Sequence, residues 1–234
     1  ALACCGFTFL LGGGPVEMIF AFIAAGVGNL IRMKLIKHHY TLFLNIAVSI
    51  SAACLTYAVC LHMAELLLHV SAVHEAGYIC SMLFIIPGFP FITSGIDLAK
   101  LDLRSGLERL TYSIIIVLGA TVFAWIMALL LKLQPQDFVA LHLGSMMHLV
   151  LRLIASFCGV FGFSIMFNSS VCIAATAACI GAVANTLRLE LVDYAGMPSA
   201  AAAFIGALTA GLLASIIKRN HGYQIGRASC RERV

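Results

Sequence analysis

Charged residues are scarce in this sequence. Only 10% of its 234 residues are Asp, Glu, Lys or Arg, whereas 62% are hydrophobic, and the mean hydropathy is +1.05. A soluble domain of this length carries about 25% charged residues. So few charges cannot cover a water-facing surface, which excludes a soluble protein and leaves the lipid bilayer as the solvent for most of the chain.

Other common signatures are also missing. The net charge of +4 is too small to indicate a nucleic-acid binder. The nine cysteines show no Cys-x-x-Cys spacing, and eight of them fall in apolar runs, which predicts buried thiols rather than a disulfide framework. There is no Gly-x-Ser-x-Gly elbow and no pair of aspartates in apposed helices, so neither an intramembrane enzyme nor a cofactor is predicted.

Long apolar segments are what the sequence does contain. Four runs without Asp, Glu, Lys or Arg each reach the roughly 20 residues that cross a bilayer core of about 30 Å; these are 40–61, 76–96, 110–131 and 194–217. We therefore predict an all-α, polytopic transmembrane helix bundle. Its eight hydrophobic segments are 1–11, 15–31, 42–62, 77–96, 109–131, 146–167, 171–190 and 198–217.

The longest polar break in the middle of the chain, Gln134-Pro-Gln-Asp137, predicts a division into two membrane domains. The first covers 1–131, a linker covers 132–145, the second covers 146–219 and a tail covers 220–234. We expect the first membrane domain to be truncated, because the apolar run 1–11 is too short for a span. Residues 225–234 resemble translated sequencing-adapter read-through, with a basic juxtamembrane tail as the alternative.

The distribution of Lys and Arg predicts the orientation in the membrane. If the loop after 15–31 is cytoplasmic, that side receives eight basic residues. The other side receives three, Lys132, Arg152 and Arg188, with the tail excluded. This bias predicts a multi-pass membrane protein in which the loop after 15–31 faces the cytoplasm.

An internal repeat relates the two halves. Residues 6–35 align without gaps on 162–191. A chance match between two apolar helix pairs is the alternative. The two copies begin five segments apart, an odd number, which predicts that they insert in opposite directions, as in many secondary transporters. The identities, all at an offset of 156 residues, are Gly6/Gly162, Phe7/Phe163, Ala21/Ala177, Asn29/Asn185, Arg32/Arg188 and Leu35/Leu191.

The segment 77–96 contains two prolines and is predicted to be broken. Proline removes a backbone donor, and lipid cannot satisfy the groups that such a break exposes. Broken helices of this kind bind anions, zwitterions or coupling ions. The alternative is a structural kink near the cytoplasmic interface with a solvated Asp97. The predicted substrate or ion pathway comprises Pro87, Gly88, Pro90, Thr93, Ser94, Asp97, Arg109 and Glu17.

Two members of this set are charged groups at the ends of other segments. Arg109 lies near the end of a stretch, 101–110, that we interpret as a short amphipathic helix with an Arg104–Glu108 pair. It is a candidate partner for Asp97 or for a substrate carboxylate, and a solvated interfacial helix is the alternative. Glu17 lies just inside 15–31, where an ionisable group is either functional or interfacial.

Other polar residues carry weaker hypotheses. Four asparagines are predicted to bond across helices rather than to contact substrate: Asn29, Asn45, Asn168 and Asn185. His62, Glu65 and His69 share one helix face, which makes zinc conceivable, but no fourth ligand is enforced and no metal is predicted.

A family resemblance becomes specific at the broken segment. The string Pro87-Gly-x-x-x-x-Thr-Ser-Gly-x-Asp97, followed by Asp102-x-x-Ser-Gly-Leu-x-Arg109, resembles the signature of the threonine/serine exporters. Gly6-Phe7 with the glycines at 12–14, and the stretch 162–168, resemble the openings of that family's two membrane domains. The resemblance covers nearly all of residues 1–219, although a cytoplasmic region before the first span and the last segments of the second domain are not present.

The resemblance implies a secondary transporter that exports threonine and serine, with protons as a candidate coupling ion. Two alternatives stay open. One is a subunit of a dicarboxylate (succinate-type) exporter, because related members split into two polypeptides are implicated in dicarboxylate efflux. The other is a channel or membrane scaffold, in which the small-residue helices serve packing alone. Substrate, coupling ion and a homo-oligomeric state are not determined by the sequence.

Overall fold

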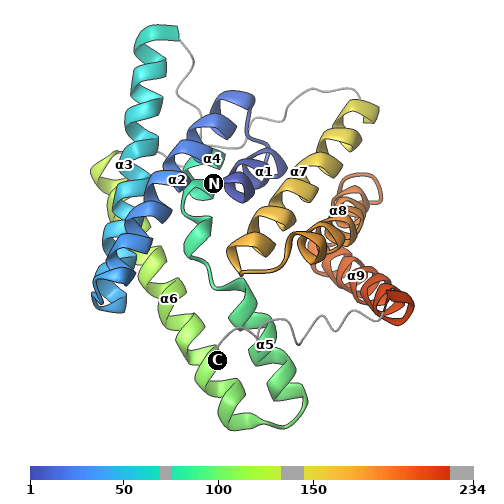
Figure 1. Ribbon diagram of the computed structural model, residues 1–234. Helices are drawn as coiled ribbons and strands as arrows, with labels where there is room; N and C mark the ends of the chain where they lie inside the picture. Colours follow the sequence, from blue (N-terminus) through green and yellow to red (C-terminus); the bar gives the residue numbers. More distant parts are fainter. Residues whose placement is uncertain (69–74, 133–144, 222–234) are drawn as a thin grey trace. The chain divides into compact units, whose positions relative to one another are not determined.

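The computed structural model describes residues 1–68, 75–132 and 145–221, and within them every regular element is helical. The predicted tail from residue 222 on, almost all of the predicted linker, and His69 lie outside these ranges. The helices, shown in Figure 1, are α1 (Leu2–Leu10), α2 (Pro15–Lys37), α3 (Leu42–Leu68), α4 (Glu75–Ser81), the 3-10 turn η1 (Leu83–Ile85), α5 (Gly88–Ala99), α6 (Leu103–Leu130), α7 (Ser145–Met166), α8 (Val171–Asp193) and α9 (Ser199–His221).

Six of the described helices are long and apolar enough to cross a membrane, and there are seven candidate spans if the bent pair α4–α5 counts as one. Their outer surfaces carry large apolar side chains that water would not favour; Leu30, Leu118, Trp125 and Phe204 are each at least 60% exposed. Such surfaces are matched to lipid. The prediction of an all-α, multi-pass membrane bundle is confirmed.

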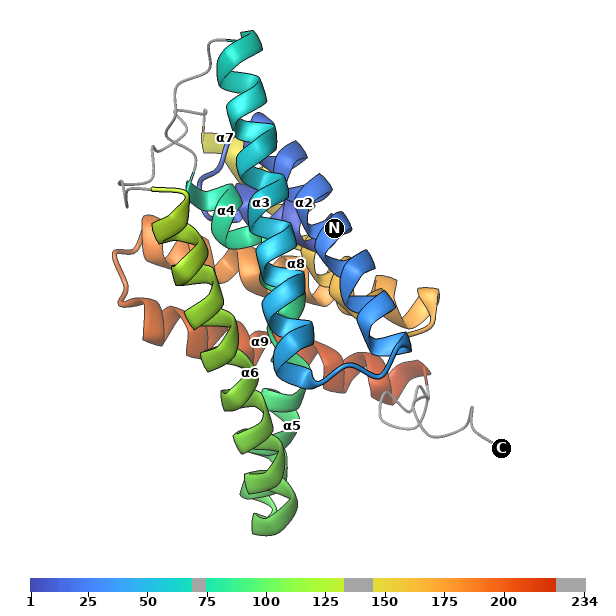
Figure 2. The same cartoon turned by 90° about the vertical axis from the view of Figure 1, so that its left-hand side faces the viewer.

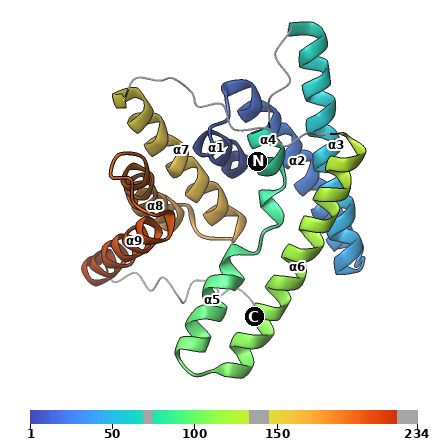
Figure 3. The same cartoon turned by 180° about the vertical axis from the view of Figure 1, so that it is seen from behind.

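The chain divides into two compact units, one containing α2 to α6 and the other containing α1 and α7 to α9. In the first unit α3 lies between α2 and α6 (Figure 2). The short helix α4 packs on α2 and α3, and α5 runs beside α6 as a hairpin (Figure 3). In the second unit the packing order is α1, α7, α8, α9.

Small residues bring these helices close together. On α2, the side chains of Ala21, Ala24 and Ala25 are completely buried. A Cβ added at Gly28 of the same helix would lie 2.7 Å from the Phe84 ring and 2.9 Å from Ala53 Cβ. Lipid provides no hydrophobic force between helices, so such close packing is a main source of their association.

The predicted break in segment 77–96 is confirmed. The α4–η1 portion and α5 differ in direction by 58°, and the chain is extended at Ile86, immediately before Pro87. Pro90 does not take part in the break. It lies in the first turn of α5, where a helix makes no use of the backbone N–H that proline lacks.

The predicted separate amphipathic helix at 101–110 is wrong. Residues 103–110 form the first turns of α6, which continues without interruption to Leu130. Asp102 caps this helix by accepting a hydrogen bond from the Ser105 backbone N–H. The polar residues of this stretch do lie on a helix, but because Asp102 is the N-cap, that helix is the beginning of the following span.

The helix boundaries follow the sequence repeat. Helices α2 and α8 begin and end at positions separated by the same 156 residues, 15–37 and 171–193. The turns before them share a left-handed residue at equivalent positions, Gly12 with φ 89° and Asn168 with φ 59°. Glycine and asparagine are the residues that adopt this conformation most readily.

Helix α1 and the last turns of α7 are also equivalent by this offset, and they pack against each other in opposite directions. Phe9, near the end of α1, contacts His148 near the start of α7. The contacts at the centre are reciprocal. A Cβ at Gly6 would lie 3.1 Å from the Gly159 nitrogen, and one at the equivalent Gly162 would lie 2.8 Å from the nitrogen of Ala3, the equivalent of Gly159. Phe7 and its equivalent Phe163 touch, with ring centroids 5.6 Å apart. This is the pattern of a two-fold contact, with its axis perpendicular to the helices.

We predict that Gly6→Ala and Gly162→Ala destabilise the protein to a similar extent. Each added methyl would meet main-chain atoms of the partner helix, which cannot swing aside, and such overpacking costs about 1–3 kcal/mol. Thermal unfolding in detergent measures the loss. The matched control is Gly211→Ala on α9, where no atom lies within 4 Å of the new Cβ. Equal melting temperatures for all three variants and the parent would contradict this packing.

Candidate functional site

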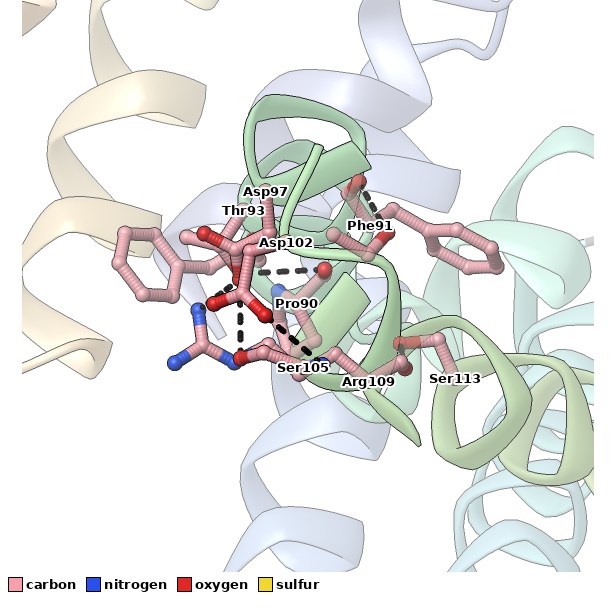
Figure 4. A network of polar contacts seen from close by, with 10 residues as sticks. Pro90, Phe91, Thr93, Asp97, Asp102, Ser105, Arg109 and Ser113 are labelled. Carbon is pink, nitrogen blue, oxygen red and sulfur yellow. Dashed lines mark hydrogen bonds and ion pairs between the residues drawn. The ribbon is translucent and has the colours of Figure 1, made fainter. Parts of the chain in front are cut away.

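The α5–α6 hairpin brings together two charged residues of the predicted pathway. Asp97 is in the last turn of α5, and Arg109 is in the second turn of α6. Arg109 Nη1 lies 2.8 Å from Asp97 Oδ2, and the Ser105 hydroxyl donates to the same oxygen at 3.4 Å. Figure 4 shows the carboxylate, the guanidinium and the hydroxyl converging at the turn between the helices.

Both partners of this ion pair remain accessible. The Arg109 side chain is 50% exposed and the Asp97 side chain 21% exposed. The backbones of the two hairpin helices approach closely at Gly106. A Cβ added to this glycine would lie 3.1 Å from the Leu98 backbone nitrogen. The site therefore combines a fixed backbone with a carboxylate and a guanidinium that a ligand can reach.

The two predicted hydroxyls satisfy carbonyls in the first turns of α5. Thr93 Oγ1 donates to Phe89 O at 3.2 Å and to Pro90 O at 3.1 Å. Ser94 donates to Phe91 O at 2.7 Å, and Ser94 is buried. Pro87 is the N-terminal cap of α5 and Gly88 its first residue, so Pro87, Gly88 and Pro90 shape the helix start.

The break is held from α2 by a residue that sequence reasoning did not place in the site. Arg32 Nη1 donates to the Phe84 carbonyl of η1 at 2.7 Å, and Gly28, four residues earlier on the same face, admits the Phe84 ring. The sequence showed Arg32 only as a basic residue and a repeat identity. The spacing of Gly28 and Arg32 could have indicated this role. A glycine lets another segment approach, and an arginine one turn later can donate to the backbone of a broken helix.

Glu17 is far from Asp97 and Arg109 in the sequence and lies in the first turn of α2. It is only 7% exposed, and it interacts electrostatically with Tyr57 of α3, which is 1% exposed. The Glu17 side chain is therefore packed among other side chains rather than exposed at the helix start.

The four asparagines occupy different settings. Asn185 Nδ2 donates to the Ser156 hydroxyl at 2.8 Å, which joins α8 to α7. Asn45 accepts a hydrogen bond from Ser49 within α3. Asn168 is exposed in the turn between α7 and α8, and Asn29 is half-buried on α2. A packing role for these residues stays a prediction.

A second charged cluster, also not predicted, lies in the unit that contains α7 and α8. Arg152 of α7 is 8% exposed. It pairs with Glu190 at 3.0 Å and with Asp193, both near the end of α8. Two carboxylates thus compensate an arginine inside a membrane helix. Within the described parts of the chain, no group of three His, Cys, Asp or Glu side chains is arranged to hold a metal.

Comparison with known proteins gives one match. The family model of the threonine/serine exporters, ThrE, matches residues 1–132, which is more than half of the chain and includes both Asp97 and Arg109. The chain belongs to the threonine/serine exporter family. No curated protein matches. No solved structure matches.

Family membership and the helical bundle together establish a multi-pass membrane transporter of the threonine/serine exporter family. The family is one of transporters rather than of enzymes. The matched region includes the broken span and the α5–α6 hairpin, so the charged pair belongs to the part of the chain that the family shares.

Proposed function

We propose that this protein is a secondary transporter that exports threonine, serine or a similar small amino acid across the bacterial inner membrane. The observation that carries the proposal is the position of the Asp97–Arg109 pair in the α5–α6 hairpin, which follows the break. A carboxylate and a guanidinium side by side match the ammonium and carboxylate groups of a zwitterionic amino acid.

In this proposal the substrate replaces the ion pair. Its ammonium group binds Asp97, its carboxylate binds Arg109, and the Ser105 hydroxyl, which already reaches Asp97, supplies a further polar contact. The pair is accessible enough to exchange partners. A dicarboxylate would offer nothing to Asp97, so the pairing favours an amino acid over the succinate-type alternative. A channel or scaffold would not require a charged pair beside a broken span.

The transport cycle is alternating access between two halves that insert in opposite directions. Support comes from the gapless sequence repeat, from the coinciding ends of α2 and α8, and from the reciprocal α1–α7 contact, whose axis is perpendicular to the helices. If these helices stand across the bilayer, that axis lies in the membrane plane, as it does in transporters with inverted repeats.

We predict that Asp97→Asn abolishes or strongly slows threonine export while the protein still inserts and folds. The neutral amide cannot bind an ammonium group as an ion pair, but the stability loss should stay below about 1 kcal/mol because the Asp97–Arg109 pair is partly exposed. Efflux of labelled threonine from proteoliposomes measures transport, and thermal unfolding measures stability. Glu108→Gln, which removes a carboxylate on the exposed face of the same hairpin, is the control. Unchanged efflux kinetics in Asp97→Asn would refute the assignment of Asp97.

We predict that the loops after α2 and α8 lie on opposite sides of the membrane. His38 and Tyr194 occupy equivalent positions at the ends of these helices, and both are exposed. His38→Cys and Tyr194→Cys are introduced singly, after replacement of the native cysteines, and treated with an impermeant maleimide. Tyr194→Cys should react in intact cells and His38→Cys only in inverted vesicles. Reaction of both from one side would exclude the inverted repeat.

A further inference from the structure

One buried carboxylate is left over once the Asp97–Arg109 site is described. Glu17 belongs to a membrane helix and is 7% exposed. An ionisable group inside a membrane bundle is costly and marks ion or proton pathways. The repeat shows that the fold itself does not require it, because the equivalent residue of α8 is Ile173.

Glu17 interacts electrostatically with Tyr57 of α3, which is 1% exposed. The second copy of the repeat has no acid at the position of Glu17, so this acid is specific to the first copy. A buried acid that only one of two equivalent helices carries indicates a function beyond packing.

The titratable groups around this pair come from the two helices packed on α2. Tyr57 interacts with Cys60 of its own helix and with Cys80 of α4 as well as with Glu17. The turn η1, Leu-Phe-Ile, contributes no titratable side chain. Tyr78 of α4 is engaged elsewhere, since its hydroxyl donates to Ala124 O of α6 at 2.8 Å.

This pair also contacts the first half of the broken span. A Cβ at Gly77 of α4 would lie 2.3 Å from the Tyr57 hydroxyl oxygen, so the hydroxyl sits directly against the α4 backbone. Helix α4 is only seven residues long, and the break at Ile86–Pro87 separates it from α5. A short helix with a break at its end is the element of this unit that can shift when the charge beside it changes.

We propose that Glu17 binds the proton that is coupled to substrate export, and that Tyr57 passes the change in charge to α4. The inference rests on the proposed function and deepens it, because it assigns proton coupling to Glu17 and leaves Asp97 for the substrate. The observations that support it are the burial of Glu17 within a membrane helix and the contact of Tyr57 with the α4 backbone.

The proton balance is that of an exchange. In the predicted orientation α2 begins at the extracytoplasmic side, so a proton from that side binds a Glu17 carboxylate oxygen and gives the neutral acid. After the conformational change the same proton leaves to the cytoplasm and restores the carboxylate, while one amino acid moves outward. The transmembrane proton gradient supplies the driving force.

The test uses proteoliposomes containing the protein, with equal labelled threonine on both sides and an imposed pH difference of one unit. This exchange moves one positive charge, so the membrane potential is held at zero. Coupling of one proton to one threonine then gives a roughly tenfold concentration ratio at equilibrium, because a one-unit gradient corresponds to a factor of ten. In Glu17→Gln the ratio should stay near one, while exchange of labelled for unlabelled threonine continues. Glu108→Gln, an exposed carboxylate on α6, should accumulate threonine like the wild type.

A tenfold ratio retained in Glu17→Gln, or a wild-type protein that exchanges threonine but ignores the gradient, would overturn the role of Glu17. A wild-type protein that does not exchange threonine at all would instead overturn the proposed function. If Glu17→Gln does not fold, the folded wild-type protein is instead treated with dicyclohexylcarbodiimide, which modifies carboxyl groups, and gradient-driven accumulation is measured again. Modification of Glu17, located by peptide mass spectrometry, should remove gradient-driven accumulation; accumulation that survives the modification would contradict the inference.

Discussion

The inability of lipid to hydrogen-bond the backbone is the constraint on which the rest of this structure depends. A helix satisfies its own groups, but the break between η1 and α5 does not, and Pro87 prevents it from closing. The protein meets this demand from outside the broken span. Arg32 of α2 donates to the Phe84 carbonyl, and Gly28 lets the two segments approach. Within the broken span, the hydroxyls of Thr93 and Ser94 bond to carbonyls of their own helix, α5.

The same constraint explains why charge gathers at only a few places. The described membrane helices bury charged side chains in two settings. Arg152 is matched by two carboxylates, and Glu17 interacts electrostatically with a buried tyrosine. The first arrangement is a compensated cluster that joins α7 to α8. The second pairs an acid with a phenol that rests on α4, next to the broken span. Glu17 differs from Arg32 and from the hydroxyls described above, because it does not serve to satisfy the break in the backbone.

Much of this architecture could be predicted from the sequence because lipid makes hydropathy a direct guide to helix position. The eight apolar segments correspond to the observed helices, and the prolines at 87 and 90 located the break. Which proline breaks the helix was not predictable from composition, since Pro90 is harmless only because α5 starts two residues earlier. The extent of α6 was missed because Asp102 was taken as part of a polar helix face rather than as the cap of a span.

The candidate site was predicted in its charged residues but not in its supports. Asp97 and Arg109 stood out because charge is rare in an apolar chain, and the hairpin brings them into contact. Arg32 stood out only as a basic residue and a repeat identity, and Arg152 only as a basic residue, because sequence spacing cannot show which helix faces a given arginine. The contact between α1 and α7 depends on long-range packing of glycines, which the repeat suggested but could not orient.

The central claim is that substrate binds in the α5–α6 hairpin that follows the break, at Asp97 and Arg109. The most direct measurement is the labelling rate of a single cysteine at Thr93, in a protein whose native cysteines have been replaced, with and without threonine in proteoliposomes. Thr93 is half-buried, close to both the break and Asp97. Bound threonine should slow the maleimide reaction, and Asp97→Asn should remove this protection. A labelling rate that threonine does not change, in a protein that still exports it, would place the transport site elsewhere.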